Sequence, residues 1–209
     1  MVRFAALVTD LVAIDVAILP PESASREAVR LSAALPTGGF RGLRLGSECL
    51  PHVTLTQQFV RATDLERALE AVGAVLRGMS APRVEVTGAE ASGATVWIAI
   101  GKTPALVDLH ERLMAALEPF ERPDGTEAAF TGGDARPRDV SWVAGFRQRS
   151  SFAAFTPHIT LGHAARRPSV RHTAFAANTI AACQLGKFCT CRTVLRSWHL
   201  RPPVQNPHP

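Results

Sequence analysis

The chain carries nearly the same five-residue string twice. It reads Pro-His-Val-Thr-Leu over residues 51–55 and Pro-His-Ile-Thr-Leu over residues 157–161. Four positions are identical, and the fifth exchanges one β-branched residue for another. With each residue type at roughly one position in twenty, such a match arises by chance in about one chain in a thousand of this length. The repeat therefore predicts that two similar strands occupy equivalent places in a duplicated fold.

The segments that lead to the two strings are also alike. Residues 12–19 form an apolar, β-branched run, which is followed by a proline pair and an amphipathic helix pattern over residues 22–35. Residues 94–100 form a second run of this kind. Thr103 and Pro104 then suit the N-cap and the first position of a second helix. A unit of strand, proline-marked turn and helix therefore occurs twice.

The rest of the chain adds elements in an order typical of an α+β protein. We expect a short strand over 43–50, a helix with a capping box over 63–77, a strand over 83–89, a loop over 121–139, and strands over 179–185 and 190–200. Because the last two strands follow each other directly around Gly186, mainly antiparallel sheets fit better than a doubly wound parallel sheet.

The repeated string places two chemical groups side by side. Side chains alternate between the faces of a strand, so the histidine and the threonine of each string point the same way, while the flanking apolar residues can enter the core. Two such strands facing each other across a cleft would present two imidazoles and two hydroxyls. One imidazole can act as base and the other as acid near neutral pH, while the hydroxyls stabilise developing charge. This set suits in-line attack on a phosphodiester without a metal or a serine or cysteine nucleophile.

Composition excludes several other classes of protein. The 209 residues are 46% apolar and 20% charged, which is typical of a globular chain and not of a disordered one. The net charge of +5 (23 basic minus 18 acidic residues) is compatible with a phosphate substrate but is not evidence for nucleic-acid binding. Asp10 and Asp15 interrupt the apolar N-terminal run, and no apolar stretch approaches membrane length. We therefore expect no signal peptide, no membrane association and a cytoplasmic location.

The four cysteines do not form a recognisable metal or disulfide pattern. Cys49, Cys183, Cys189 and Cys191 include no Cys-x-x-Cys pair, and an i, i+2 bridge between the last two is poorly matched to disulfide geometry. A zinc site would need histidines nearby at ligand spacing, and none is evident in the sequence. We expect four reduced, mostly buried thiols, no metal and no cofactor.

The paired strings resemble the motifs of the two-histidine (2H) phosphoesterase superfamily, and within it the bacterial 2′-5′ RNA ligase-like and RNA 2′,3′-cyclic phosphodiesterase branch. The resemblance implies a duplicated bilobal α+β fold of residues 1–209, with two mainly antiparallel sheets, helices on their outer faces and a central cleft between the lobes. It implies that His52 and His158 are the acid–base pair and that Thr54 and Thr160 bind the phosphate. Which histidine is the base stays open at this point.

The resemblance also implies an activity, namely metal-independent hydrolysis of a 2′,3′-cyclic phosphate on an RNA end or a nucleotide by a monomeric enzyme. The 2′-phosphate is the expected product. Two alternatives remain: ligation of RNA through a 2′-5′ bond, and binding of a nucleotide or RNA without turnover. Members of the family often place a tyrosine near the base, whereas this chain contains no tyrosine. Substrate identity is therefore less constrained than reaction type.

Further residues are candidates for substrate contacts. They are two phenylalanines that could stack on a base and three arginines that could reach a phosphate or ribose: Phe155, Phe188, Arg41, Arg147 and Arg149. The remaining histidines and the tryptophans are assigned structural roles. We expect His110 to be partly exposed on a helix, His163 to face away from the site because of its odd spacing from the motif, and Trp97, Trp142 and Trp198 to pack in the core or between lobes.

Overall fold

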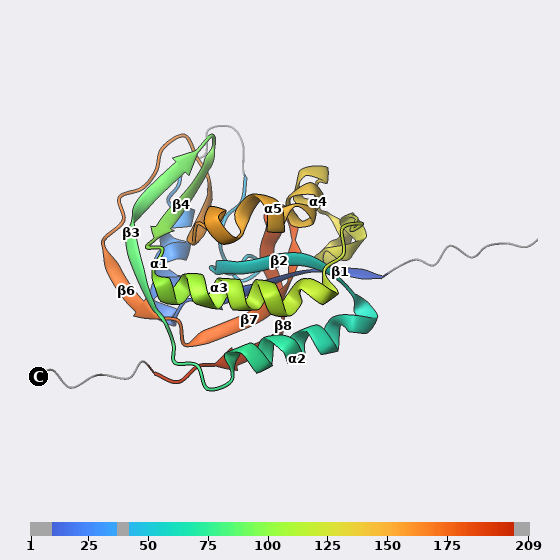
Figure 1. The fold of residues 1–209 in the computed structure, drawn as a ribbon. Helices are drawn as coiled ribbons and strands as arrows, with labels where there is room; N and C mark the ends of the chain where they lie inside the picture. Colours follow the sequence, from blue (N-terminus) through green and yellow to red (C-terminus); the bar gives the residue numbers. More distant parts are fainter. Residues whose placement is uncertain (1–9, 37–41, 203–209) are drawn as a thin grey trace, which may run out of the picture.

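The computed structural model describes residues 10–36 and 42–202 and shows an α+β fold with two antiparallel sheets (Figure 1). One sheet has the strand order β2-β1-β7-β8 and the other has the order β5-β4-β3-β6. The strands are β1 (Leu11–Leu19), β2 (Val53–Arg61), β3 (Arg83–Ser92), β4 (Thr95–Ile100), β5 (His158–His163), β6 (Thr173–Ala176), β7 (Thr179–Gly186) and β8 (Thr190–His199). The helices are α1 (Glu22–Ala33), α2 (Leu65–Leu76), α3 (Pro104–Leu117), α4 (Pro137–Ala144) and α5 (Phe146–Ser150). Short 3-10 turns cover Ala62–Asp64, Glu118–Phe120, Glu127–Ala129, Thr131–Gly133, Phe152–Ala154 and Lys187–Cys189.

The duplication predicted from the sequence is present in the fold. In each sheet the strand that carries the repeated string lies at an edge and pairs antiparallel with the strand that opens its unit, so β2 pairs with β1 and β5 pairs with β4. Thr103 caps α3 by accepting a hydrogen bond from the Leu106 amide, and Pro104 occupies the first turn. The proline-marked turn therefore starts the helix as its sequence indicates.

The two units exchange their helices. α1 follows β1 of the first sheet but packs against β5 of the second, whereas α3 follows β4 of the second sheet but packs against β2 of the first (Figure 1). α2 lies beside α3 and β8. One buried apolar cluster runs through both sheets and includes Ile14, Val53, Ile98 and Leu161. The lobes are therefore interlocked around a shared core.

Each motif strand contains a β-bulge at the same place. The β1–β2 register passes from Thr54 to Thr56, and the β4–β5 register passes from Thr160 to Gly162, so the leucine of each string is the extra residue. The bulged leucine of the first string is Leu55. A bulge disrupts the hydrogen-bond ladder locally, and the backbone groups it leaves out need other partners when they are buried.

The exchanged helices supply those partners. His110 of α3 donates from Nδ1 to the Leu55 carbonyl oxygen at 2.6 Å, and its Nε2 accepts the Phe152 amide at 2.8 Å. Ser32 of α1 donates to the Leu161 carbonyl oxygen at 2.5 Å and accepts the Leu45 amide at 2.8 Å. His110 and Ser32 are both fully buried. The expectation that His110 is partly exposed is wrong, because its helix packs against the sheet of the other lobe.

Several predicted elements differ in detail. Residues 43–50 form isolated bridges instead of a strand, and α2 follows a 3-10 turn without a side-chain cap. The segment 121–139 is loop and 3-10 turn up to Pro137, where α4 starts. The pattern did not predict α4, α5 or β6. No helix in residues 10–36 and 42–202 combines the length and apolar character that crossing a bilayer requires.

Candidate active site

The four motif side chains meet at one cleft with a volume of ≈ 690 Å³. Its walls include groups from the edge strands of both sheets, namely His52, Thr54, His158 and Thr160. Side-chain alternation places each histidine and threonine on the cleft face, while Val53, Leu55, Ile159 and Leu161 enter the core. The cleft therefore holds the two imidazoles and two hydroxyls that the repeat predicts.

Both imidazoles are oriented in the same way by their own backbone. His52 Nδ1 lies 2.7 Å from the carbonyl oxygen of Leu50, and His158 Nδ1 lies 2.8 Å from that of Thr156. A carbonyl can only accept, so each Nδ1 carries the hydrogen. Nε2 is then the nitrogen left to exchange a proton with a substrate.

His158 is held toward its neutral form. Burial lowers its pKa from the ordinary 6.5, the bond to the Thr156 carbonyl opposes this, and the charge of His52 lowers it further. That last effect requires the two imidazoles to lie close enough to interact electrostatically. The Trp97 ring lies beside the His158 ring with centroids 5.7 Å apart. The imidazole therefore has an apolar neighbour, which is consistent with the direction of its pKa.

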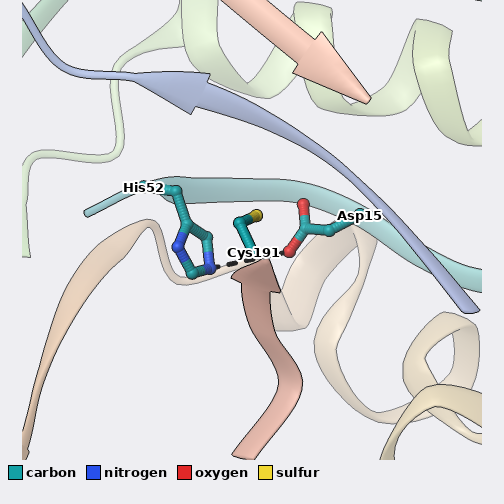
Figure 2. A group of neighbouring side chains, drawn as sticks. All are labelled: Asp15, His52 and Cys191. Atoms are coloured by element: carbon teal, nitrogen blue, oxygen red, sulfur yellow. Dashed lines mark ion pairs between the residues drawn. The ribbon is translucent and has the colours of Figure 1, made fainter. Parts of the chain in front are cut away.

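The first motif has a buried carboxylate beneath it. Asp15 of β1 is fully buried, and its Oδ2 accepts hydrogen bonds from the Thr54 hydroxyl at 2.7 Å and from Gln57 Nε2 at 2.8 Å. The same oxygen lies 3.8 Å from His52 Nε2 (Figure 2). Burial raises the pKa of Asp15, while His52 and the two hydrogen bonds lower it. The sequence analysis missed this residue, whose one signal is an acid inside an apolar strand.

The bulges bring one further residue of each strand to the cleft. Gln57 and His163, each five positions after the motif histidine, both line it. The expectation that His163 faces away is wrong, because the extra residue at the bulge reverses the alternation after it. Gly162 permits this bulge with φ of 143°, where a Cβ would lie 2.3 Å from the Leu43 carbonyl oxygen. The Leu43 amide donates to His163 Nδ1 at 3.0 Å, and burial lowers the pKa of His163.

The predicted arginines do not line the cleft in the described part of the chain. Arg147 forms an ion pair with Glu121, and Arg149 donates to the Ser141 carbonyl. Arg41 lies outside the described residues. The cations that do line the cleft are Arg136 and Arg138, near and in α4. Sequence reasoning missed them because both arginines lie in the segment 121–139, which was predicted to be a loop.

Both predicted phenylalanines line the cleft, in different ways. Phe188 has a left-handed φ of 66°, its amide donates to Asp139 at 3.1 Å, and the Arg136 guanidinium lies 3.9 Å from its ring centroid. Phe155 is buried and stacks on His110 with centroids 4.1 Å apart. Phe155 therefore stabilises the wall of the cleft by packing against His110, whereas Phe188 is held at the surface of the cleft by polar contacts.

The expectation that the tryptophans pack in the core or between the lobes is wrong for Trp142, which lines the cleft and is 44% exposed. Trp97 is half-buried and lines the cleft. Trp198 packs against the core and its indole faces Gly73 of α2. A large aromatic residue on a strand or helix that borders a cleft can therefore line the cleft, so its residue type alone does not predict burial.

Comparisons with solved structures identify this architecture. The chain superposes on TT0787 of Thermus thermophilus with a TM-score of 0.62 at 20% identity, over 91% of this chain and 99% of that one. A structure of E. coli LigT complexed with 3′-AMP gives 0.54 at 18% identity, over 91% and 99% of the chains. A structure described as a phosphoesterase gives 0.51 at 19% identity, over 90% and 98%. Among curated proteins, none matches the chain.

Two antiparallel sheets that each bring a His-x-Thr string to a common cleft place the chain in the class of the two-histidine phosphoesterases. A family model described as the 2′-5′ RNA ligase superfamily matches residues 20–189, and the chain belongs to this superfamily. The matched segment includes both motifs and both exchanged helices, α1 and α3.

Proposed function

We propose that the protein hydrolyses a 2′,3′-cyclic phosphate at the end of an RNA or on a nucleotide, without a catalytic metal. The observation that carries this proposal is the placement of both motif histidines at one cleft, each with Nδ1 bound to a backbone carbonyl and Nε2 left for proton transfer. Such a pair can serve as base and acid on opposite sides of one phosphorus.

The proton transfers are assigned from the surroundings of the two imidazoles. His158, whose pKa is lowered, takes a proton from the attacking water as a new P–O bond forms. The bond from phosphorus to the ribose 3′ oxygen breaks, and His52 gives its Nε2 proton to that oxygen. The product carries a 2′-phosphate. His158 then releases its proton to solvent and His52 takes one up, which restores the starting state of both imidazoles. Asp15, 3.8 Å from His52 Nε2, is the acidic group nearest the positive charge of this acid.

The phosphate is held mainly from the second motif. Thr160 lines the cleft, whereas the Thr54 hydroxyl donates to Asp15. A hydroxyl has one hydrogen, so Thr54 can donate to a phosphate only when that bond to Asp15 is released. Arg136 and Arg138 supply positive charge at the wall. The 3′-AMP complex of E. coli LigT favours a nucleotide-phosphate ligand for this fold.

The test uses the full chain with 2′,3′-cyclic nucleotides and a cyclic-phosphate-ended oligonucleotide, with and without a chelator. We expect turnover that survives chelation and that falls by about a hundred- to ten-thousand-fold in His52→Ala and in His158→Ala. His172→Ala changes an exposed histidine outside the cleft and is the matched control. Turnover that chelation abolishes would overturn the metal-free mechanism.

Two other outcomes would point to other functions. Joining of the cyclic-phosphate end to a 5′-hydroxyl strand would identify a ligase, in which that hydroxyl replaces water in the same proton transfers. Tight nucleotide binding without turnover in the wild type would identify a binding module. The superfamily to which the chain belongs makes ligation the first alternative to examine.

A further inference from the structure

Three side chains from distant parts of the sequence converge beneath His52. They are Asp15 in the middle of β1, His52 just before β2, and Cys191 on β8. One oxygen, one nitrogen and one sulfur atom of these residues all lie within 4.8 Å of one another, and Figure 2 shows the three side chains next to each other, with His52 facing Asp15. We propose that this trio, called the Asp–His–Cys site below, binds a zinc ion and that the bound zinc inhibits the enzyme.

The donor set matches the chemistry of zinc. A thiolate, an imidazole and a carboxylate are its usual ligands, and a sulfur donor disfavours magnesium and calcium. In a tetrahedral zinc site, bonds of this kind separate neighbouring ligand atoms by about 3.3–3.8 Å. His52 Nε2 and Asp15 Oδ2 are already 3.8 Å apart. Small side-chain adjustments would therefore bring the trio to coordination distance.

The imidazole of His52 is oriented to bind a metal through Nε2. His52 Nδ1 is bound to the Leu50 carbonyl at 2.7 Å, which directs the lone pair of Nε2 toward Asp15 and Cys191. A histidine that binds a metal through one nitrogen usually gives its other N–H to such an acceptor. The β-bridge between Leu50 and Cys191 ties this part of the backbone to β8. Two of the three ligands therefore share one rigid support.

A second observation concerns Oδ1, the carboxylate oxygen of Asp15 that does not form the contact with His52 Nε2. Asp15 Oδ1 is buried and has no hydrogen-bond partner among the described residues, although Oδ2 accepts two hydrogen bonds. A buried acceptor without a partner is unfavourable unless it finds a donor or a metal. A divalent cation would offset the charges of the ionised carboxylate and thiolate.

The fourth ligand position of the proposed zinc ion would face the cleft. Asp15 and Cys191 are fully buried, whereas His52 is 11% exposed and lines the cleft with Thr54 and Thr190. Zinc would reach the site past His52, with water or a phosphate oxygen as its fourth ligand. On binding, the Cys191 thiol loses its proton, and the ion takes the Nε2 lone pair of His52. His52 can then neither carry nor release a proton.

The inhibition part of this proposal rests on the proposed function, whereas the binding part does not. The experiment therefore begins with Co²⁺ as a spectroscopic stand-in for zinc, titrated into the chelator-treated full chain. One equivalent of Co²⁺ should produce thiolate-to-cobalt charge-transfer absorption, and Zn²⁺ should displace it. Because the thiol must be deprotonated, the affinity should rise with pH.

Matched variants separate the site from other thiols. Cys191→Ala removes a ligand, so the cobalt band should vanish and Zn²⁺ affinity by calorimetry should fall about a hundredfold or more. Cys189→Ala changes a thiol that lines the cleft and is not part of the trio, so it should keep the band. Thermal unfolding of each variant establishes that it is folded, and Cys191→Ser replaces Cys191→Ala if the latter does not fold.

The activity arm distinguishes the two proposals. Zn²⁺ should inhibit cyclic-nucleotide hydrolysis by the wild type, half-maximally near its calorimetric Kd, and Cys191→Ala should be at least tenfold less sensitive. An unchanged cobalt spectrum in Cys191→Ala, or no stoichiometric Co²⁺ binding by the wild type, would overturn the Asp–His–Cys site even if the enzyme is active. A wild type that binds Co²⁺ through sulfur but turns over no substrate would overturn the proposed function and leave the site intact.

Discussion

The two halves of the cleft carry the same motif in different surroundings. In the first half, Thr54 and His52 face the buried carboxylate of Asp15, which pairs with Gln57 across the β1–β2 register. In the second half, the position that matches Asp15 is Thr95, which pairs with His163. His158 there lies beside an indole, and the acid that acts on its pKa, Glu90, does so less strongly than burial. The duplication preserved the backbone and changed the polar neighbours.

The different neighbours of the two histidines show how a duplicated fold can carry out a reaction that needs an acid on one side and a base on the other. Acid–base hydrolysis needs one histidine that begins neutral and one that begins protonated. Identical halves would give both histidines the same environment. The apolar neighbour on one side and the carboxylate on the other distinguish them without moving either imidazole.

The largest expected effect tests this division of roles. His52→Asn and His158→Asn should each lower kcat/KM for a cyclic nucleotide by about a hundred- to ten-thousand-fold. With a phosphodiester whose leaving group is p-nitrophenolate, which departs without a proton, His52→Asn should regain most of the loss and His158→Asn should not. Steady-state kinetics on both substrates measure this. Recovery in His158→Asn instead would reverse the assignment.

The threonines should differ for the same reason. Thr160→Val should lower kcat by about a hundred- to a thousand-fold, because it removes a donor to the developing charge. Thr54→Val should lower kcat only about tenfold, since its hydroxyl donates to Asp15 at 2.7 Å. The conservative changes Thr160→Ser and Thr54→Ser keep the hydroxyl and should retain activity. Equal losses in the two valine variants would show that Thr54 also donates to the phosphate.

The sequence was sufficient for the features that the repeat encodes. The order of strands and helices predicted the antiparallel α+β fold, and the duplicated string predicted the placement of His52 and His158 on equivalent strands, since alternation and turn signals are local properties. The roles of these residues remain predictions. Asp15 and Cys191 were not recognised because their neighbourhood arises only when β1, β2 and β8 come together. The local pattern also misplaced His163, because a bulge breaks the period of two.

The exchanged helices give a second comparison, between His110 and Ser32, each bound to the carbonyl of a bulged leucine. His110→Ala should destabilise the fold by about 3–5 kcal/mol, because it leaves the buried Leu55 carbonyl and the partly buried Phe152 amide without this partner and opens a cavity beside Phe155. Chemical denaturation measures this, with His172→Ala as an exposed control. A loss as small as that of the control would show that the bulge does not depend on this contact.

The same histidine should make stability sensitive to acid. Burial lowers the pKa of His110; Glu111 opposes this, and Lys102 and Arg147 add to it. The unfolded state therefore binds the proton at a higher pH, so stability is lost as the pH falls below the ordinary value of 6.5. His158 and His163 shift in the same direction. Between about pH 7.5 and 5.5, the free energy of unfolding should fall less steeply with decreasing pH in His110→Ala than in the wild type. An equal slope in the two proteins would assign the acid sensitivity to His158 and His163.

Ser32 should show the smallest effect, and it tests whether the two lobes depend on their exchanged helices to similar degrees. Ser32→Ala leaves the Leu161 carbonyl and the Leu45 amide without this partner but opens almost no cavity, so a loss of about 1–3 kcal/mol is expected. Ser23→Ala, on the exposed side of the same helix, is the control and should change stability little. Because Leu161 belongs to the second motif, the variant should also lower turnover through misplacement of His158 and Thr160, whereas His110→Ala acts on the first motif. A Ser32→Ala protein that loses stability but keeps full activity would mean that α1 supports the fold of the second lobe without positioning its catalytic strand.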